Sequence, residues 1–391
     1  MTASIYQSTF IMCEEFIMAK LPTPQEIYER VIRHVDNKTT DVGEGIWREP
    51  VENYQSMERF QAELKMMRRI PLPFCPSAAL PEAGSYIARA AAGTPLLVVR
   101  GDDGVVRAFR NACRHRGMAL KEGSGCAKSF VCPYHAWTYS LDGALKHIPG
   151  FEGFPSVDKE SHGLVAVTAE EKSGIVFVTQ EKPVSDGALE CLPEIIKPEQ
   201  KVFNSLEFVD EANWKLIGET SMEGYHIRAL HNKSFYPYGY DNLNIIELYK
   251  RNALIVFPFN RIERLREKLP EDRNYAGRFT QVFQIFPHAH TSVLSNHTLF
   301  IILEPLTPTS TRWVVYQLTN EGEAATEESL EIARRDANFV QDTGLLEDRA
   351  AAKSIQDGIS SEANEYFTFG KYEQVICNFH RSLDELIAQT N

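Results

Sequence analysis

The stretch from Cys113 to His135 reads CRHRGMALKEGSGCAKSFVCPYH and decides how the rest of the chain is interpreted. It contains two short pairs, Cys113 with His115 and Cys132 with His135. Each pair is compact enough to bind one metal centre from one tight loop, and each offers one thiolate and one imidazole. A structural zinc finger normally presents its ligands in the order Cys, Cys, His, His. The alternating order therefore predicts a different kind of centre.

A two-iron cluster whose irons differ fits this ligand order best. Both thiolates bind one iron and both imidazoles bind the other, which is the arrangement of a Rieske 2Fe–2S centre. Neutral imidazoles lower the net negative charge of the cluster and so raise its reduction potential. Gly117 and the turn at 123–125 let backbone amides approach the sulfur atoms, while Pro133 stiffens the second loop. A mixed Cys/His zinc site is the alternative. Cys126 fits neither spacing and is interpreted as a buried thiol rather than a ligand.

The two pairs also carry a family resemblance. The sequence C-R-H-R-G at 113–117, followed by C-P-Y-H-A-W-T-Y at 132–139, resembles the Rieske domain of the ring-hydroxylating oxygenase alpha-subunit family. Short β-rich runs at 85–89, 96–100 and 105–109 surround these loops and predict a small all-β domain. The resemblance implies that the cluster ligands are Cys113, His115, Cys132 and His135.

Composition excludes several classes of function. The formal net charge of −12 over 391 residues argues against binding to nucleic acid or to an anionic membrane. No apolar run approaches the roughly 18 residues that a transmembrane helix needs. Seven cysteines, an odd number without regular spacing, are typical of a reducing compartment in which thiols bind metal or remain free. We therefore expect a cytoplasmic protein without a nucleic-acid partner or a membrane span.

A second group of metal-ligating residues follows the sequence N-W-K-L at 213–216. Glu223 and His226 are three residues apart, so that a helix would place them on one face, and His231 follows five residues later. Two His and one carboxylate form the facial triad that binds non-haem Fe(II) and leaves positions open for O2. Taken alone, two His at this spacing are more often structural. After a Rieske motif, however, the segment resembles the mononuclear-iron site of the same family.

The resemblance also suggests the remaining site residues. The segment around Leu345-Leu346-Glu347-Asp348 resembles the family helix that supplies the iron carboxylate, and Asp348 is the expected ligand with Glu347 in reserve. Glu223 stands where the family more often has an Asp that links a cluster His to an iron His across a subunit contact. Some members that act on trimethylammonium compounds resemble this Glu variant.

We expect an α+β chain with three parts. Residues 1–70 form a mostly helical N-terminal segment that packs on the catalytic domain, and residues 71–180 form the Rieske domain. Residues 181–391 form the mononuclear-iron catalytic domain, in which antiparallel strands are flanked by helices. The resemblance implies a helix-grip fold for this domain. An amphipathic helix at 372–389 is expected to close it.

The resemblance implies a terminal oxygenase component that hydroxylates an organic substrate, most often an aromatic one, with O2. Because the chain has no G-x-G-x-x-G fingerprint, we expect electrons to come from a separate NAD(P)H-dependent reductase, directly or through a ferredoxin. A head-to-tail homotrimer, with or without beta subunits, would bring the cluster of one subunit to the iron of the next. One alternative is a monooxygenase or demethylase acting on a non-aromatic substrate such as a quaternary ammonium compound. A Rieske electron carrier without oxygenase chemistry is the other.

Overall fold

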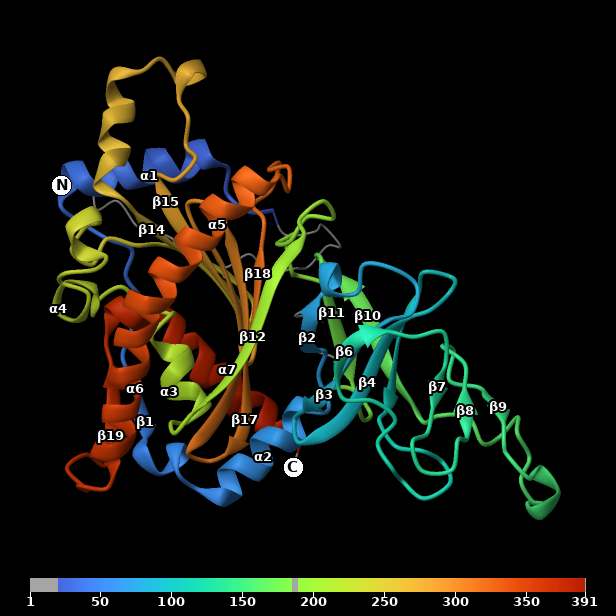
Figure 1. Cartoon of the computed structure of the whole chain (residues 1–391). Coiled ribbons are helices and arrows are strands. Elements are labelled where there is room, and N and C mark those ends of the chain that lie inside the picture. The colour runs from blue at the N-terminus through green and yellow to red at the C-terminus, as the bar shows by residue number, and fades with distance from the viewer. Residues whose placement is uncertain (1–19, 185–188, 391) are drawn as a thin grey trace.

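The computed structural model describes residues 20–184 and 189–390 of the chain. The first nineteen residues of the predicted N-terminal segment lie outside this range. Figure 1 shows two antiparallel sheets side by side, with most of the helices gathered against the second sheet. None of the helices in the described ranges is long and apolar enough to cross a membrane.

The first sheet, here called the N-terminal sheet, has seven strands in the order β2-β11-β10-β5-β4-β3-β6. A separate three-stranded sheet, β7-β8-β9, follows the second Cys/His loop. The strand-rich prediction for this region is therefore confirmed. The strands are β2 (Leu72–Pro76), β3 (Ser85–Ala91), β4 (Thr94–Arg100), β5 (Val106–Arg110), β6 (Gly123–Cys126), β7 (Phe130–Val131), β8 (Thr138–Tyr139), β9 (Leu145–His147), β10 (Ala166–Lys172) and β11 (Ile175–Thr179).

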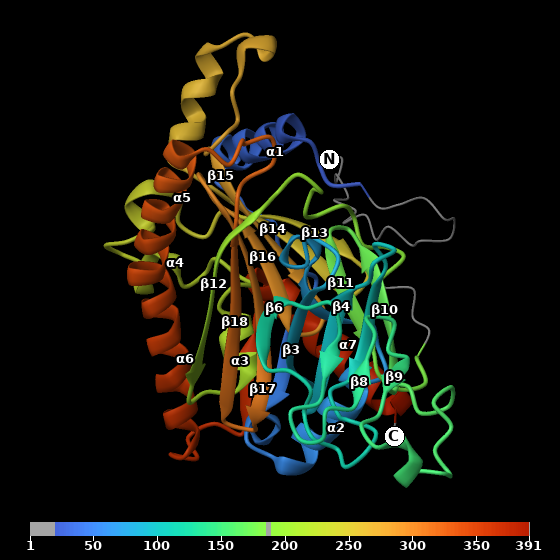
Figure 2. The same cartoon turned by 45° about the vertical axis from the view of Figure 1, so that its right-hand side comes forward.

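The second sheet, here called the central sheet, also has seven antiparallel strands, in the order β12-β18-β17-β16-β15-β14-β13. Helices cover one face of it, and the N-terminal sheet lies on its other side (Figures 1 and 2). The strands are β12 (Val202–Asp210), β13 (Ile245–Tyr249), β14 (Asn252–Pro258), β15 (Phe279–Ile285), β16 (Ala289–Val293), β17 (Thr298–Thr307) and β18 (Ser310–Leu318). The helices are α3 (Trp214–Glu219), α4 (Ile227–Leu230), α5 (Glu327–Val340), α6 (Leu346–Ile359) and α7 (Gln374–Thr390).

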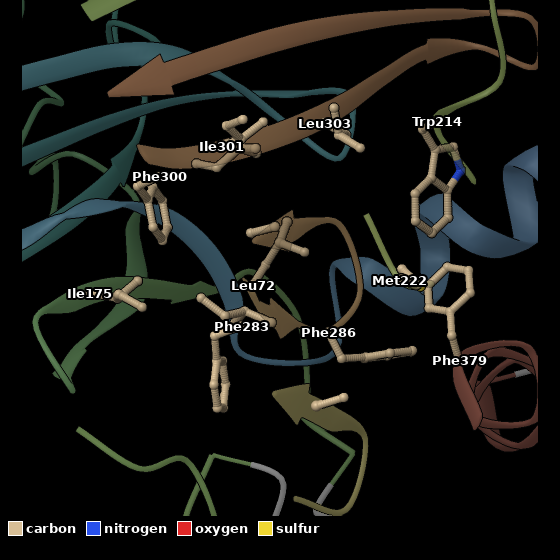
Figure 3. Packing of buried hydrophobic residues seen from close by; sticks show 14 of the residues in the cluster. Leu72, Ile175, Trp214, Met222, Phe283, Phe286, Phe300, Ile301, Leu303 and Phe379 are labelled. Carbon is tan, nitrogen blue, oxygen red and sulfur yellow. The ribbon is translucent and has the colours of Figure 1, made fainter. Parts of the chain in front are cut away.

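Strand β17 is buried on both faces, and this explains its nearly continuous apolar sequence. Side chains alternate along a strand, so Phe300 and Ile302 face one side while Leu299 and Ile301 face the other. Figure 3 shows part of the resulting core, to which the N-terminal sheet, the central sheet and α7 all contribute. Both sheets and the helices therefore share one large hydrophobic core, and a second, smaller core that includes Leu97, Phe109 and Trp137 lies around the Cys/His loops.

The described part of the N-terminal segment, residues 20–70, contains one strand besides its helices. Helix α1 (Pro24–Asn37) begins with a capping box, since the Thr23 hydroxyl accepts from the Glu26 amide and the Glu26 carboxylate accepts from the Thr23 amide. Between α1 and α2 (Met57–Met67), however, residues Trp47–Pro50 form strand β1, which pairs with β19 (Tyr366–Phe369). This pairing attaches the N-terminal segment to the C-terminal part of the chain.

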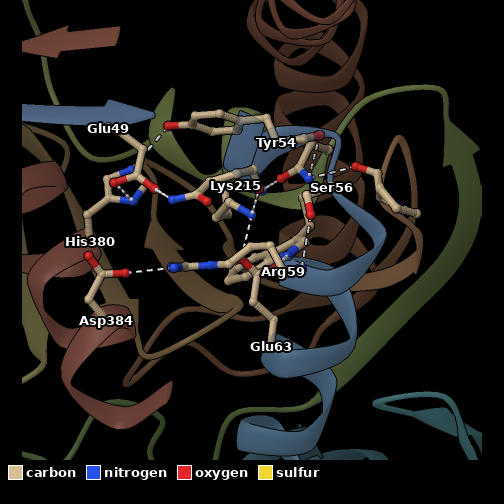
Figure 4. Close-up of polar contacts among 12 residues, drawn as sticks. Glu49, Tyr54, Ser56, Arg59, Glu63, Lys215, His380 and Asp384 are labelled. Atoms are coloured by element: carbon tan, nitrogen blue, oxygen red, sulfur yellow. Dashed lines mark hydrogen bonds and ion pairs between the residues drawn. The ribbon is translucent and has the colours of Figure 1, made fainter. Parts of the chain in front are cut away.

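A buried polar cluster fixes the start of α3 (Figure 4). The Lys215 ammonium donates to a Glu63 carboxylate oxygen at 2.6 Å, and both side chains are almost fully buried. Glu63 also accepts from the Trp214 indole at 2.9 Å and from Arg59 at 3.0 Å. Helix α2 thus supplies the central carboxylate of the cluster through Glu63. The cluster holds α3 in place before the chain enters the segment that contains Glu223.

Candidate metal centres

The two Cys/His pairs lie in matching loops. In the first loop the Cys113 amide donates to the Met118 carbonyl at 2.8 Å, and in the second the Cys132 amide donates to the Trp137 carbonyl at 2.9 Å. The fifth residue of each loop has a left-handed backbone, with φ of 77° at Gly117 and 57° at Ala136. Both Cys side chains are buried. The turns therefore aim two thiols and two imidazoles at one region.

The imidazoles of His115 and His135 lie close together, with ring centroids 4.6 Å apart. The His115 ring stacks on Trp137 at a centroid distance of 5.0 Å, so its orientation is fixed. Its Nδ1 atom is buried and has no hydrogen-bond partner among the described residues. A buried polar atom without a partner is costly unless it binds a ligand. Burial also lowers the pKa of His115, which favours the neutral, metal-binding form. These residues fit a Rieske cluster.

Two cysteine predictions are corrected by the structure. Cys126 is exposed on β6, where its thiol lies 3.7 Å from the Ala83 carbonyl, so it is not a buried thiol. Strand β6 is the terminal strand of its sheet, and all four of its residues are exposed. The expectation that cysteines bind metal or stay free is also wrong at Cys191, which is disulfide-bonded.

The hydroxyl of Tyr139 lies 3.3 Å from the Cys113 sulfur and accepts from the Arg114 amide at 3.0 Å. A hydrogen bond to a cluster sulfur stabilises the more negative, reduced state.

We therefore expect Tyr139→Phe to lower the reduction potential of the cluster by tens of millivolts. A hydrogen bond contributes about 0.5–1.5 kcal/mol, and about 59 mV corresponds to a tenfold change for one electron. Redox titration of the visible spectrum measures the shift. Tyr134→Phe removes an exposed hydroxyl and is the control; equal potentials in both variants would contradict the prediction.

His226, His231 and Asp348 converge as predicted. The Nε2 atoms of the two imidazoles are 3.2 Å apart, and the Asp348 Oδ1 atom lies 3.1 Å from that of His231 and 3.6 Å from that of His226. Helix α4 ends at Leu230, just before His231, so the chain turns the second imidazole toward the first. All three ligand atoms lie within 4.8 Å of one another. The arrangement has the composition of a 2-His-1-carboxylate metal site.

A carboxylate accepts a hydrogen bond from Nδ1 of each imidazole and so orients the ring. Nδ1 of His226 donates to Glu223, and Nδ1 of His231 donates to Glu347 at 2.6 Å. With both Nδ1 atoms engaged, the two Nε2 lone pairs are left to face a metal. Burial alone would lower the pKa of His231, but Asp348 and Glu347 together raise it, and the same negative charges favour a cation between the imidazoles. The Asp348 Oδ1 atom is buried without a hydrogen-bond partner among the described residues, which also fits a metal ligand.

Glu347, the reserve ligand, therefore lies on the far side of His231 rather than in the ligand set. Five residues of π-helix, Gln341–Leu345, connect α5 to α6 and set which face of α6 meets the imidazoles. Gly344 lies in this segment, and a Cβ atom there would be 2.1 Å from the Phe235 ring. This π-helix was not predicted from the sequence, in which Gly344 just before the L-L-E-D motif is the signal that could have indicated it.

A cavity of about 330 Å³ opens beside the three converging residues. Its polar residues include Arg261 and Asp336, which the sequence did not identify. Tyr238 also lines the cavity, whereas its neighbours Tyr236 and Tyr240 do not. Most of the wall is apolar or aromatic: Ile217, Ile227, Phe235, Phe257, Phe259, Val282, Leu294, Leu299, Ile301, Trp313, Phe339, Val340 and Leu345.

Family comparisons agree with this geometry. Residues 71–158 match the Rieske 2Fe–2S domain model, and residues 201–389 match the model described as ring hydroxylating alpha subunit, catalytic domain. The chain belongs to the Rieske-type ring-hydroxylating oxygenase family. Membership in this family confirms the predicted fold class and implies a Rieske cluster and a mononuclear iron as its cofactors. Rieske oxygenases take electrons from a reductase and form oligomers.

Relatives within the family include subunits that act on quaternary ammonium compounds. The glycine betaine monooxygenase oxygenase subunit of Chromohalobacter salexigens is 37% identical over 159 residues, which cover 39% of this chain and 36% of that protein. The carnitine monooxygenase oxygenase subunit of Escherichia coli is 34% identical over 197 residues, covering 47% and 52%. Such matches span about a third to a half of the length of these relatives. The glycine betaine subunit of Pseudomonas aeruginosa is 26% identical and covers 77% and 79%.

Solved Rieske oxygenase structures share the fold. The quaternary ammonium Rieske monooxygenase CntA in complex with L-carnitine has a TM-score of 0.71 at 22% identity, covering 94% of this chain and 99% of that one. Naphthalene 1,2-dioxygenase with bound indole has a TM-score of 0.70 at 20% identity, covering 88% and 93%. At these identities the likeness concerns the fold alone.

Proposed function

We propose that this chain is the terminal oxygenase component of a Rieske system, which hydroxylates an organic substrate with O2. Cys113, His115, Cys132 and His135 would bind the cluster, and His226, His231 and Asp348 would bind the mononuclear Fe(II). The observation that carries the proposal is the convergence of these last three residues at one end of an apolar cavity. An electron carrier would need neither the convergence nor the cavity. In this assignment residues 71–180 are the cluster domain and residues 181–391 the catalytic domain, against which the segment 1–70 packs.

When bound, the cluster transfers single electrons and the mononuclear iron activates O2. The chain itself supplies orientation and exclusion of water. Glu223 and Glu347 hold each imidazole in one tautomer, so that Nε2 of both faces the metal position. The apolar wall excludes bulk water and leaves space for an apolar substrate body beside the ligands.

Electrons would come from an NAD(P)H-dependent reductase, directly or through a ferredoxin, and pass between subunits of a homotrimer, with or without beta subunits. We propose that His135 of one subunit meets Glu223 of the next. Two surfaces support this contact. His135 is exposed beside Tyr134, which is 53% exposed, and Glu223 lies beside Tyr225, which is 60% exposed. Exposed aromatic side chains next to both residues are typical of a protein–protein interface.

The aromatic wall of the cavity suits either of two substrate classes. Phe257, Phe259 and Trp313 could stack on an aromatic ring, in keeping with dioxygenase relatives. The same rings could surround a quaternary ammonium group by cation–π attraction. This second class is favoured by the carnitine and glycine betaine relatives and by Glu223 in place of Asp. Hydroxylation of a carbon bonded to the nitrogen would then break the C–N bond and release both an amine and an aldehyde, whereas an aromatic substrate would gain hydroxyl groups.

The test is iron and acid-labile sulfide analysis on protein purified without air, together with a visible spectrum. We expect two cluster irons, two sulfides and one further iron per chain in a brown solution. Single turnover of the dithionite-reduced protein with O2 and a panel of aromatic and quaternary ammonium compounds then identifies the product class. Two irons per chain with no uptake of added Fe(II) would favour the electron carrier. Colourless protein containing zinc would refute the cluster assignment.

A further inference from the structure

One cation on the cavity wall, Arg261, has no ion-pair partner among the described residues. Arg261 lies at the start of a 3-10 helix, Asn260–Glu267, and its side chain both lines the cavity and is exposed to solvent. Its guanidinium donates to the Ser295 hydroxyl at 3.1 Å and lies 4.8 Å above the Phe259 ring. Within the described ranges no carboxylate lies within ion-pair distance of it. Arg261 therefore lies where the cavity meets solvent, and its guanidinium has further N–H donors besides the one that binds Ser295.

Two nearby arginines show the contrast, because each is paired with a carboxylate. On the same 3-10 helix Arg266 pairs with Asp36 at 2.7 Å, and near the iron ligands Arg349 pairs with Asp210 at 2.6 Å. The chain has 53 acidic against 41 basic residues, so acidic partners are abundant. Near Arg261, however, lies another cation, since Arg278 donates to the Arg261 carbonyl at 3.3 Å. Burial and then the charge of Arg278 lower the pKa of Arg261, although an arginine remains protonated.

The carboxylates of the cavity are already engaged by other groups. Glu223 accepts from His226, and Asp348 belongs to the metal-binding set. Asp336 accepts from Nδ1 of His297 at 2.8 Å and from the Asn296 amide at 3.2 Å. The charge of Asp336 acts on Arg261 from beyond ion-pair distance, so no carboxylate among the described residues binds the guanidinium directly, and an anion from solution is its natural partner. A planar carboxylate fits best, because the guanidinium fork can donate to both of its oxygens.

We propose that Arg261 is a specificity-determining residue that binds a carboxylate carried by the substrate. This inference rests on the proposed function and narrows its substrate class. The substrate would have an apolar body against the aromatic wall, a carboxylate on Arg261 and its reacting carbon near His226, His231 and Asp348. Aromatic acids and trimethylammonium acids both meet this description, whereas unsubstituted hydrocarbons do not.

Binding to the intact holoprotein tests the inference without turnover. Isothermal titration under nitrogen compares benzoate and 3-phenylpropanoate with the corresponding neutral amides. Whichever of the two carboxylates binds more tightly is expected to bind the wild-type protein at least about tenfold more tightly than its own amide. The reason is that hydrogen bonds between charged groups are stronger than those to neutral groups. Arg261→Gln should abolish this preference and Arg261→Lys should retain part of it. Arg264→Gln, on the same 3-10 helix but outside the cavity, is the matched control and should keep the preference.

The outcomes separate this inference from the proposed function. If neither carboxylate binds better than its amide, or if Arg261→Gln keeps the preference, Arg261 does not select the substrate. Iron content and single turnover, measured on the same preparations, report independently on the oxygenase assignment. If the protein prefers carboxylates but cannot bind the third iron, Arg261 is confirmed as an anion site and the oxygenase assignment is refuted. Normal iron content and turnover without a preference for carboxylates over amides would support the oxygenase assignment and refute the role of Arg261.

Discussion

Glu223→Gln is expected to retain both metal centres and to lose turnover by about 100-fold or more, equivalent to about 2.7 kcal/mol in the activation free energy. In the structure the carboxylate of Glu223 accepts from Nδ1 of His226 and from the amides of Tyr225 and His226. Gln has the same shape and can still accept from the imidazole, so iron binding should survive. It lacks the negative charge that would couple His226 to a cluster imidazole of the neighbouring subunit.

The measurement is the rate at which the reduced cluster is reoxidised after mixing with O2 and substrate, followed by stopped-flow absorbance. Iron and sulfide content must first match those of the wild-type protein. Glu373→Gln is the control, because that carboxylate binds the Gly370 amide and touches neither imidazole. Glu347→Gln should behave differently, since Gln can still accept from His231 and residue 347 acts within one chain, so that both iron content and reoxidation should stay close to those of the wild-type protein. A wild-type rate of reoxidation in the Glu223→Gln variant would refute the proposed coupling of His226 to the cluster of the neighbouring subunit through Glu223.

Local spacing carried most of what the sequence could reveal about the site. Cys113 with His115, Cys132 with His135, and His226 with His231 are each separated by so few residues that one loop or turn brings each pair together. The distant partner Asp348 could be chosen only through family resemblance, because no periodicity connects residue 348 to residue 226. The structure brings these three residues together, and their roles as ligands remain predictions.

Features that depend on contacts between distant segments were missed. Strand β1 was assigned to a helical segment because its partner β19 is more than three hundred residues away. Cys126 was predicted to be buried because thiols usually are, yet it lies on a terminal strand whose four residues are all exposed. No local sequence pattern distinguishes Arg261 from the other arginines. Only the folded chain shows that it lines the cavity without an ion-pair partner among the described residues. Burial and pairing of charge are properties of the folded chain.

Lys215→Met is expected to lower the free energy of unfolding by about 3 kcal/mol, because removing one member of a buried ion pair leaves the other charge uncompensated. Lys215 is fully buried, and its ammonium also donates to the Asn53 carbonyl at 2.9 Å. Glu63 would keep Arg59 and Trp214 as partners, which places the loss at the lower end of the usual range of about 3–5 kcal/mol. Urea unfolding followed by tryptophan fluorescence measures the loss. Lys353→Met, which removes an exposed i,i+4 pair with Asp357, is the control and should cost under about 0.5 kcal/mol.

The double variant Lys215→Met, Glu63→Leu distinguishes the ion pair from simple packing. Replacing both charges by apolar groups removes the uncompensated carboxylate, so part of the lost stability should return, although the Trp214 indole loses its acceptor. Function should not return with it, because α3 would lose the contact between Lys215 and Glu63 of α2 (Figure 4) that fixes α3 before the chain reaches Glu223. We therefore expect partly restored stability but weaker retention of the mononuclear iron in the double variant. Stability and iron binding restored together would mean that packing alone positions α3, and that the buried charges of Lys215 and Glu63 do not contribute to the metal site.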